Sequence, residues 1–256
     1  MKPDKNSNFI RIMFFGLFAY LIFSPQICEV KLISIANVKS DLPKDQKSPK
    51  GETRNTVTKE AMKVLNGTNH PYILLVEKSN FTLKVIRADG KVIKVSPVAI
   101  GKNKDGRAKL YQGDGRTPEG IYKITEILSL DAPQNSRSYK KLLSMNSAYF
   151  KASEGHHKWG QPDVDIGRNA YGPRFFRINY PNQADLNRYK EAKKKGLIPK
   201  KKHRYVGIGG GLAIHGYKDE LSIGHKVSRG CIMLKNKDII QLDKYIKIGT
   251  PVMIVN

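Results

Sequence analysis

The chain has 256 residues, with 46 Lys and Arg against 22 Asp and Glu, so its formal net charge is +24. A composition of 39% hydrophobic residues, 22 Gly and 13 Pro is typical of a globular protein and argues against a collagen-like, coiled-coil or wholly disordered chain. Only two cysteines are present, Cys28 and Cys231, which excludes a disulfide framework and a four-thiolate zinc site. The positive charge favours a polyanionic neighbour: nucleic acid, anionic lipid or an acidic polymer.

The first 28 residues have the anatomy of an export signal. Basic residues within the first eleven positions precede an uncharged, mostly apolar run at 12–23, which Ser24 and Pro25 end. That run is shorter than the roughly 20 residues that span a bilayer, so we favour a cleaved signal peptide over a retained N-terminal anchor. Residues 29–70 are polar and poor in aromatic residues, which predicts a linker with a short helix near 57–65.

From residue 71 onward the chain is rich in β-branched residues and turn signals, which predicts a mainly β (β-rich α+β) domain at 71–256. Strand-like runs flank Asp89-Gly90, a dipeptide that is typical of a hairpin turn. Further strands are predicted at 121–128 and 249–256. Between them, apolar residues at helical spacing predict a short amphipathic helix within 236–249.

The stretch at 129–205 has few strand signals and is strongly basic. It carries 17 Lys and Arg and 6 Asp and Glu, or 17 − 6 = +11 of the net charge. Its length predicts a large basic insertion or lid in the β domain. Because it lacks nucleic-acid-binding motifs, we expect it to face an anionic wall polymer or membrane surface and not nucleic acid. A merely solvated basic face is the simpler alternative.

One thiol and one imidazole are the candidates for chemistry. Cys231 follows Gly230 directly and lies sixteen residues beyond His215. A nucleophilic thiol needs a base, which His215 can supply, and small neighbours that let a substrate carbonyl approach. A small buried thiol and a structural histidine are the alternative interpretation. The pair His156-His157 lacks further ligand residues nearby, and the glycine-rich runs lack the context of nucleotide-binding loops, so we expect no metal and no other cofactor.

Several motifs resemble those of the L,D-transpeptidase catalytic domain family (YkuD type). The sequence GDGRTPEG at 113–120, followed by Ile-Tyr, is similar to the family's G-x-T-P-x-G-x-Y motif. The sequences IHG at 214–216 and SRGC at 228–231 are similar to its His-Gly … Ser-x-Gly-Cys signature, with the family's spacing. The resemblance covers about residues 71–256.

The resemblance implies a sandwich of mixed sheets around a catalytic cleft, with a short helix in the C-terminal region. It also implies a cysteine acyl-enzyme that attacks peptidoglycan stem peptides at the third residue and releases terminal D-alanine. Transfer to an amine then gives a 3→3 cross-link or attaches a protein to the wall. The alternatives are an L,D-carboxypeptidase or trimming enzyme of the same fold, and a non-catalytic wall-binding protein. Both the transpeptidase and the carboxypeptidase activity imply export to the periplasm or cell envelope.

The resemblance assigns roles to particular residues. It makes Cys231 the nucleophile and His215 the general base, whose imidazole the carbonyl of Gly216 orients. The backbone amide of Gly230 is expected to contribute to the oxyanion hole, and Arg229 to support the thiolate or the oxyanion.

Further positions of the motif are expected to contact substrate, and two depart from the family pattern. Tyr205 and Tyr217 are expected to line the cleft, and Ser228 to contact the substrate. Many members carry His where Arg229 stands, and a guanidinium cannot act as a base. Many also carry Arg or Asn where Met233 stands, so the choice of acceptor is the property that these departures put in question.

Overall fold

The structure is a computed structural model that describes residues 50–256, with side chains from residue 56 on. The expected signal or anchor at 1–28 and the first part of the linker lie outside the described residues. The second part of the expected linker is a helix, α1 (Lys50–Asn66), which is longer than the predicted one. No helix within the described range has the length and apolar character that crossing a membrane requires.

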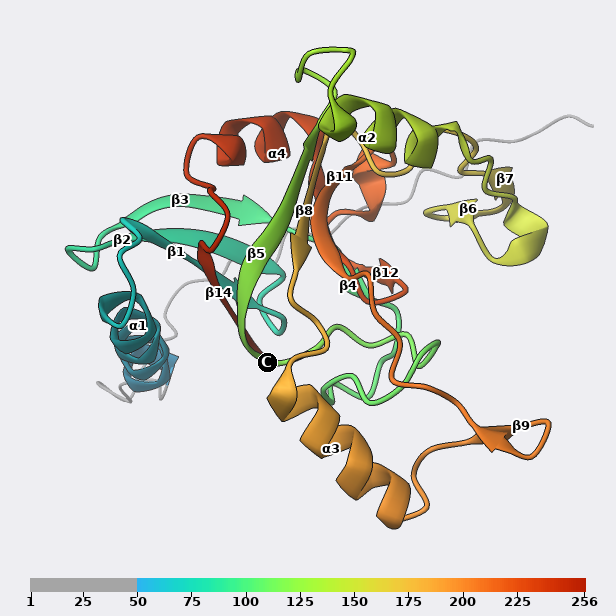
Figure 1. Ribbon diagram of the computed structural model, residues 1–256, viewed down its shortest axis with the longest axis horizontal. Coiled ribbons are helices and arrows are strands. Elements are labelled where there is room, and N and C mark those ends of the chain that lie inside the picture. Colours follow the sequence, from blue (N-terminus) through green and yellow to red (C-terminus); the bar gives the residue numbers. More distant parts are fainter. Residues whose placement is uncertain (1–49) are drawn as a thin grey trace, which may run out of the picture. The chain divides into compact units, whose positions relative to one another are not determined.

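The described chain is built on one eight-stranded mixed sheet with the order β13-β11-β8-β5-β14-β1-β2-β3 (Figure 1). Its strands, in chain order, are β1 (Tyr72–Glu77), β2 (Thr82–Arg87), β3 (Val92–Pro97), β5 (Gly120–Ser129), β8 (Arg174–Ile178), β11 (Ala213–Tyr217), β13 (Ile232–Lys235) and β14 (Pro251–Val255). β14 pairs in parallel with β1 and antiparallel with β5, so it joins the two parts of the sheet. The predicted β-rich class is therefore confirmed.

Three short strand pairs and three further helices complete the described elements. The strand pairs are β4 (Ile100–Gly101) with β12 (Lys226–Ser228), β6 (His157–Lys158) with β7 (Gln161–Asp165), and β9 (Lys200–Lys201) with β10 (Arg204–Tyr205). The helices are α2 (Arg137–Ser147), α3 (Gln183–Lys194) and α4 (Asn236–Asp243), and single turns of 3₁₀ helix occur at Ala152–Glu154 and Glu220–Ser222. The predicted hairpin turn at Asp89-Gly90 and the predicted helix within 236–249 are both present.

The sheet encloses the main core on its inner face. Side chains from β1 and β2, such as Leu74 and Val85, share this core with Phe176 of β8, Ile214 of β11 and Leu234 of β13. Residues of the two halves of the sheet therefore pack against one another, as in a sandwich. Helix α4 adds two further buried side chains to the same core.

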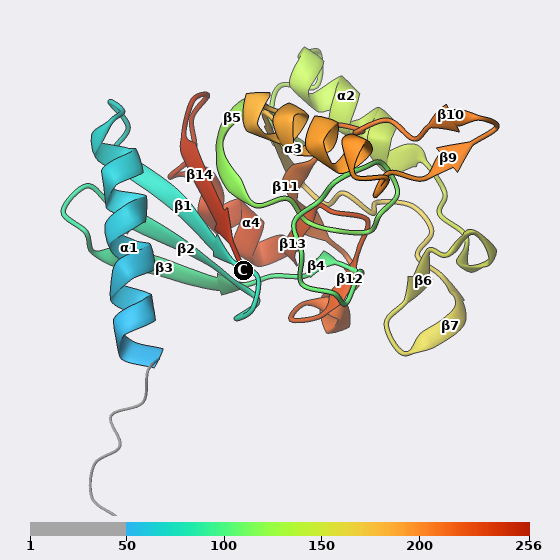
Figure 2. The same ribbon diagram turned by 90° about the horizontal axis from the view of Figure 1, so that it is seen from below.

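Helices cover the outer face of the sheet. Ala61 and Leu65 of α1 pack on Ile73 and Leu75 of β1, and the figures show α1 lying along the β1–β2 part of the sheet (Figures 1 and 2). Helix α2 is amphipathic and is capped at its N-terminus by Ser136, whose side chain accepts a hydrogen bond from the amide of Tyr139. It covers the other outer cluster, which includes Phe175 of β8 and Ala213 of β11.

The stretch at 129–205 is not one insertion, because β8 lies within it. β8 pairs with both β5 and β11 in the middle of the sheet. The stretch therefore consists of two excursions, one before β8 with α2 and the β6–β7 pair, and one after it with α3 and the β9–β10 pair. The alternation that identifies a strand is missing from RFFRI because four of its five residues are buried.

Candidate active site

Two neighbouring strands bring the candidate nucleophile and base together. β11 and β13 run in parallel, with Ile214 beside Ile232 and His215 beside Met233. This register puts Cys231, which directly precedes β13, next to Ala213 on β11. Cys231 is half-buried against the main core, whereas His215 is only 3% exposed.

The imidazole of His215 is held by its backbone neighbour and by aromatic rings. Its Nδ1 donates a hydrogen bond to the carbonyl oxygen of Gly216 at 2.7 Å, so the unprotonated nitrogen is Nε2. The ring stacks on Phe175 at a centroid distance of 5.7 Å, and the ring of Tyr171 lies 5.2 Å away. Burial lowers the pKa of His215 to about 4, and the bond to Gly216 opposes this shift only in part. The imidazole is therefore neutral at pH 7.

Burial also determines the state of the thiol. It raises the pKa of Cys231, and three weaker influences oppose it: a hydrogen bond from the backbone of Ala213 and the positive charges of Lys109 and Arg177. The resting pair is therefore a neutral thiol and a neutral imidazole. We expected Arg229 to support the thiolate, but the cations that lower the pKa of Cys231 are Lys109 and Arg177.

The turn that precedes Cys231 is fixed by internal hydrogen bonds. Ser228 Oγ donates to the carbonyl of Cys231 at 2.6 Å and accepts from the amide of Gly230 at 3.0 Å. Gly230 has φ = +132°, and a Cβ there would lie 2.7 Å from the carbonyl oxygen of Arg116. Only glycine fits this conformation and this contact. In this structure the Gly230 amide and the Ser228 hydroxyl are bonded within the turn, and their expected roles at the oxyanion and at the substrate stay predictions.

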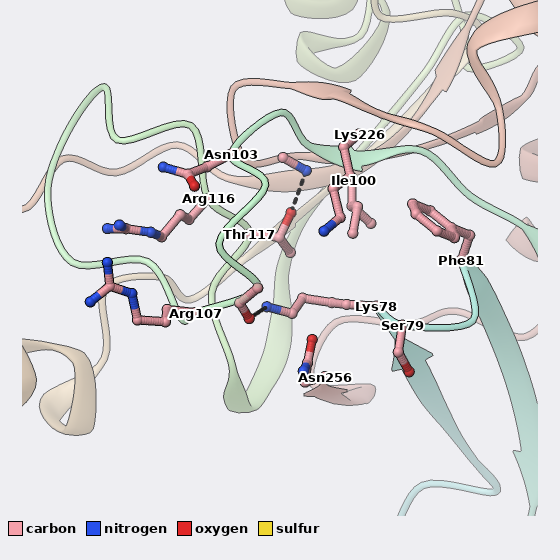
Figure 3. A pocket seen from close by; sticks show the side chains of 12 residues that line it. Lys78, Ser79, Phe81, Ile100, Asn103, Arg107, Arg116, Thr117, Lys226 and Asn256 are labelled. Carbon is pink, nitrogen blue, oxygen red and sulfur yellow. Dashed lines mark hydrogen bonds between the residues drawn. The ribbon is translucent and has the colours of Figure 1, made fainter.

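The GDGRTPEG motif forms the support beneath this turn. Its Asp114 side chain is buried, accepting hydrogen bonds from Lys109 Nζ at 2.7 Å and from the amide of Leu110 at 2.7 Å. Thr117 Oγ1 accepts a hydrogen bond from the amide of Gly101 at 2.9 Å, which ties the motif to β4 (Figure 3). Since β4 pairs with β12, the motif is connected to the strand that leads into Cys231.

The other expected substrate residues do not gather at one place. Tyr217 lines a pocket together with Arg229, whose guanidinium donates to the carbonyl of Glu154 at 3.0 Å. Tyr205 lies on β10, where Lys193 and Lys200 place their ammonium groups 4.6 and 4.9 Å from its ring centre, so its contacts are with the α3 region and not with the candidate pair. Met233 is buried at 5% exposure and its backbone pairs with Ala99.

Residues outside the motifs complete the site. Tyr171 and Phe175 contact His215, and Lys109 and Arg177 act on the thiol. Burial, and then the charge that Cys231 carries once it is deprotonated, raise the pKa of Tyr171, so this ring lies near both members of the pair. No sequence pattern marked Tyr171 or Lys109, because their proximity to the pair depends on contacts between segments that are far apart in the chain.

The family model of the L,D-transpeptidase catalytic domain (YkuD) matches residues 71–254. The chain belongs to this family. The resemblance that the motifs indicated is thus confirmed, and the match includes both His215 and Cys231. No curated protein matches the chain.

Several solved structures are similar to the chain. Bd1075 from Bdellovibrio bacteriovorus is 26% identical, with 73% of this chain and 48% of that chain covered and a TM-score of 0.43. The helical cell shape determining protein Pgp2 from Campylobacter jejuni is 20% identical, with coverages of 77% and 54% and a TM-score of 0.41. L,D-transpeptidase 3 from Mycobacterium tuberculosis is 16% identical, with coverages of 73% and 60% and a TM-score of 0.38. The chain thus spans about half to three fifths of the length of these structures.

Proposed function

We propose that the protein is a cysteine-dependent acyltransferase that acts on peptidoglycan stem peptides. The observation that carries this proposal is the imidazole of His215. Its Nδ1–H donates to Gly216, its Nε2 has no hydrogen-bond partner among the described residues, and it lies on the strand beside Cys231. This is the arrangement that a general base for a thiol needs. Gly216 acts here as a positioning residue.

The first step transfers an acyl group to the thiol. His215 Nε2 takes the proton of Cys231 as the sulfur attacks the carbonyl carbon of the third stem residue. The peptide bond to the terminal D-alanine then breaks, and the leaving amine takes the proton back from the imidazolium. In the second step an amine attacks the thioester and the thiol is restored. Because both groups start neutral, proton transfer accompanies attack and no ion pair has to form beforehand.

The acceptor in the second step determines the product. An amine of a second stem peptide gives a 3→3 cross-link, and an amine of a wall-anchored protein gives protein attachment. Water in place of the amine gives the carboxypeptidase reaction. We propose that the acceptor is a stem-peptide amine. A hydrolytic product would show that the acceptor is water, and it would leave the thioester step of the proposal unchanged.

The test uses purified protein and a stem tetrapeptide. Mass spectrometry should show the wild-type protein heavier by the tripeptide acyl group, whereas Cys231→Ala should show no adduct and His215→Ala a strongly slowed one. Separation of the soluble products then distinguishes a cross-linked dimer from a free tripeptide. If Cys231→Ala still releases D-alanine at the wild-type rate, the proposed nucleophile is wrong.

We further propose that the segment at 179–205 docks the protein on the anionic wall after export to the cell envelope. It carries nine Lys and Arg against two Asp and Glu, or a net +7. Removing the three lysines at 200–202 should weaken binding to isolated sacculi and reduce its salt dependence. Binding that is insensitive to salt would contradict the proposal. The matched control replaces three exposed lysines outside this segment, Lys237, Lys244 and Lys247.

A further inference from the structure

A pocket beside the Cys231 turn collects cations that have no carboxylate partner. Lys102, Lys226 and Arg229 line it, together with the rings of Trp159 and Tyr217. None of these three cations forms an ion pair with an acid in the described part of the chain. Unpaired cations around one hollow create a local positive potential, which attracts an anionic group.

The cations are held in place by the backbone that carries the nucleophile. The amide of Lys102 donates to the carbonyl of Ser228 at 2.7 Å, and Lys226 lies beside Ile100 in the β4–β12 pair. Arg229 is two residues before Cys231 and donates to the carbonyl of Glu154. A group bound between these side chains is therefore fixed relative to the thiol.

The β6–β7 region forms the other wall of the pocket. The amide of Trp159 donates to Asp219 Oδ2 at 2.8 Å, and its indole stacks on His225 at 4.2 Å. That amide occupies one oxygen of Asp219, the acid that lines the pocket. Burial and then the charge of Arg229 lower the pKa of His156, the charge of Glu154 opposes them, and the charge of Lys102 lowers it further, so both cations act on this side of the pocket.

A neighbouring cavity differs from this pocket in that most of its cations form ion pairs (Figure 3). It shares Lys226 with the first pocket, but its other cations have partners. Lys78 pairs with Glu119 at 2.5 Å, and both Arg107 and Arg116 pair with Asp105. The cations of this cavity other than Lys226 are therefore compensated, whereas three cations line the pocket with Trp159 and its one lining acid, Asp219, forms no ion pair with them in the described part of the chain.

We propose that the Lys102–Lys226–Arg229 pocket binds a carboxylate of the stem peptide and so orients it for the attack by Cys231. This inference rests on the proposed function and specifies the group that the site recognises. A stem peptide offers two internal carboxylates: the α-carboxylate of a γ-linked glutamate, and the side-chain carboxylate of diaminopimelate at the third position. Both present the same chemistry to a lysine pair, and an experiment can separate them.

The pocket contains its own reporter, because Trp159 is the one tryptophan of the chain. In a Cys231→Ala background, titration with the stem tetrapeptide should change the fluorescence of Trp159 and give a Kd. We expect Lys102→Gln with Lys226→Gln to weaken this binding at least tenfold. Lys237→Gln, which removes an exposed charge on α4, should leave the Kd unchanged.

Amidated peptides identify the carboxylate. Amidation of the recognised carboxylate should weaken binding to the Cys231→Ala protein with both lysines intact about as much as the double substitution does. Amidation of the peptide should then cause no further loss of binding in the double variant. Amidation at the other carboxylate should have no effect. An unchanged Kd in the double variant, or full additivity with both amidated peptides, would overturn the proposal.

The pocket and the proposed function can fail separately. Lysine-dependent binding without any thioester in the wild-type protein leaves the pocket standing and refutes the acyltransferase. A thioester that forms equally fast in wild type and in the double variant, with the same Kd, supports the acyltransferase and refutes the pocket.

Discussion

The buried neutral state of His215 should appear as a pH dependence of stability. The pKa of this imidazole is about 4 in the folded chain, because burial disfavours its charge, and an exposed imidazole in the unfolded chain has a pKa of 6.5. Between these values the unfolded chain binds more protons, so the free energy of unfolding falls as the pH decreases from 6.5 towards 4. Each unit costs at most about 1.4 kcal/mol, and the contribution of His215 to the loss between pH 6.5 and 4.5 is about 2 kcal/mol, because the unfolded imidazole is only half protonated at pH 6.5.

Urea unfolding at the two pH values measures this loss. Other groups also titrate in the same window, so the decisive quantity is the difference between wild type and His215→Gln. That variant removes the titration and should lose about 2 kcal/mol less stability than wild type on acidification. His203→Gln, on an exposed turn, serves as the matched control and should behave like wild type. Equal losses in wild type and His215→Gln would refute a buried neutral imidazole.

Three further outcomes are expected. Gly230→Ala should destabilise the fold by about 2–6 kcal/mol and abolish acylation, because backbone strain adds to a clash with a backbone carbonyl. The control is Gly224→Ala, where φ is +95° but the space around a Cβ is open, and this change should cost only about 1–3 kcal/mol in thermal or urea unfolding. Asp114→Asn should cost about 3–5 kcal/mol, because it leaves a buried ammonium without its carboxylate; an unchanged Tm would contradict this. Iodoacetamide should label Cys231 slowly at pH 7, since burial raises its pKa, and Arg177→Gln should slow labelling further; faster labelling would count against the electrostatic argument.

Local signals in the sequence predicted the parts of the fold that local chemistry determines. The hairpin at Asp89-Gly90 requires a positive φ that glycine supplies, and Gly90 has φ = +82°. The helix that contains Ile239 and Leu242 follows from their spacing, and both are fully buried. The motif around Cys231 indicated the family, which the family model confirms.

Contacts between distant segments were beyond sequence reasoning. Nothing near Tyr171 or Lys109 marks them as neighbours of the candidate pair, since the strand pairing that brings them there depends on the whole sheet. Ser228 carries the residue type of a substrate contact, but its hydroxyl is used twice within its own turn. The aromatic ring of Tyr205 suggested a cleft residue, but the ring contacts the ammonium groups of Lys193 and Lys200 in its own region.

β14 controls when the sheet can form. Within the described chain it is the last strand, yet four strands lie on one side of it and three on the other. An N-terminal fragment that lacks 251–255 therefore has two unpaired strand edges, on β1 and β5, and an open core between them. A chain that emerges gradually from a ribosome or a membrane pore therefore cannot complete the sheet until this segment arrives. The joining of the two halves, and with it the packing of Cys231 against the core that they share, depends on the last strand that the structure describes.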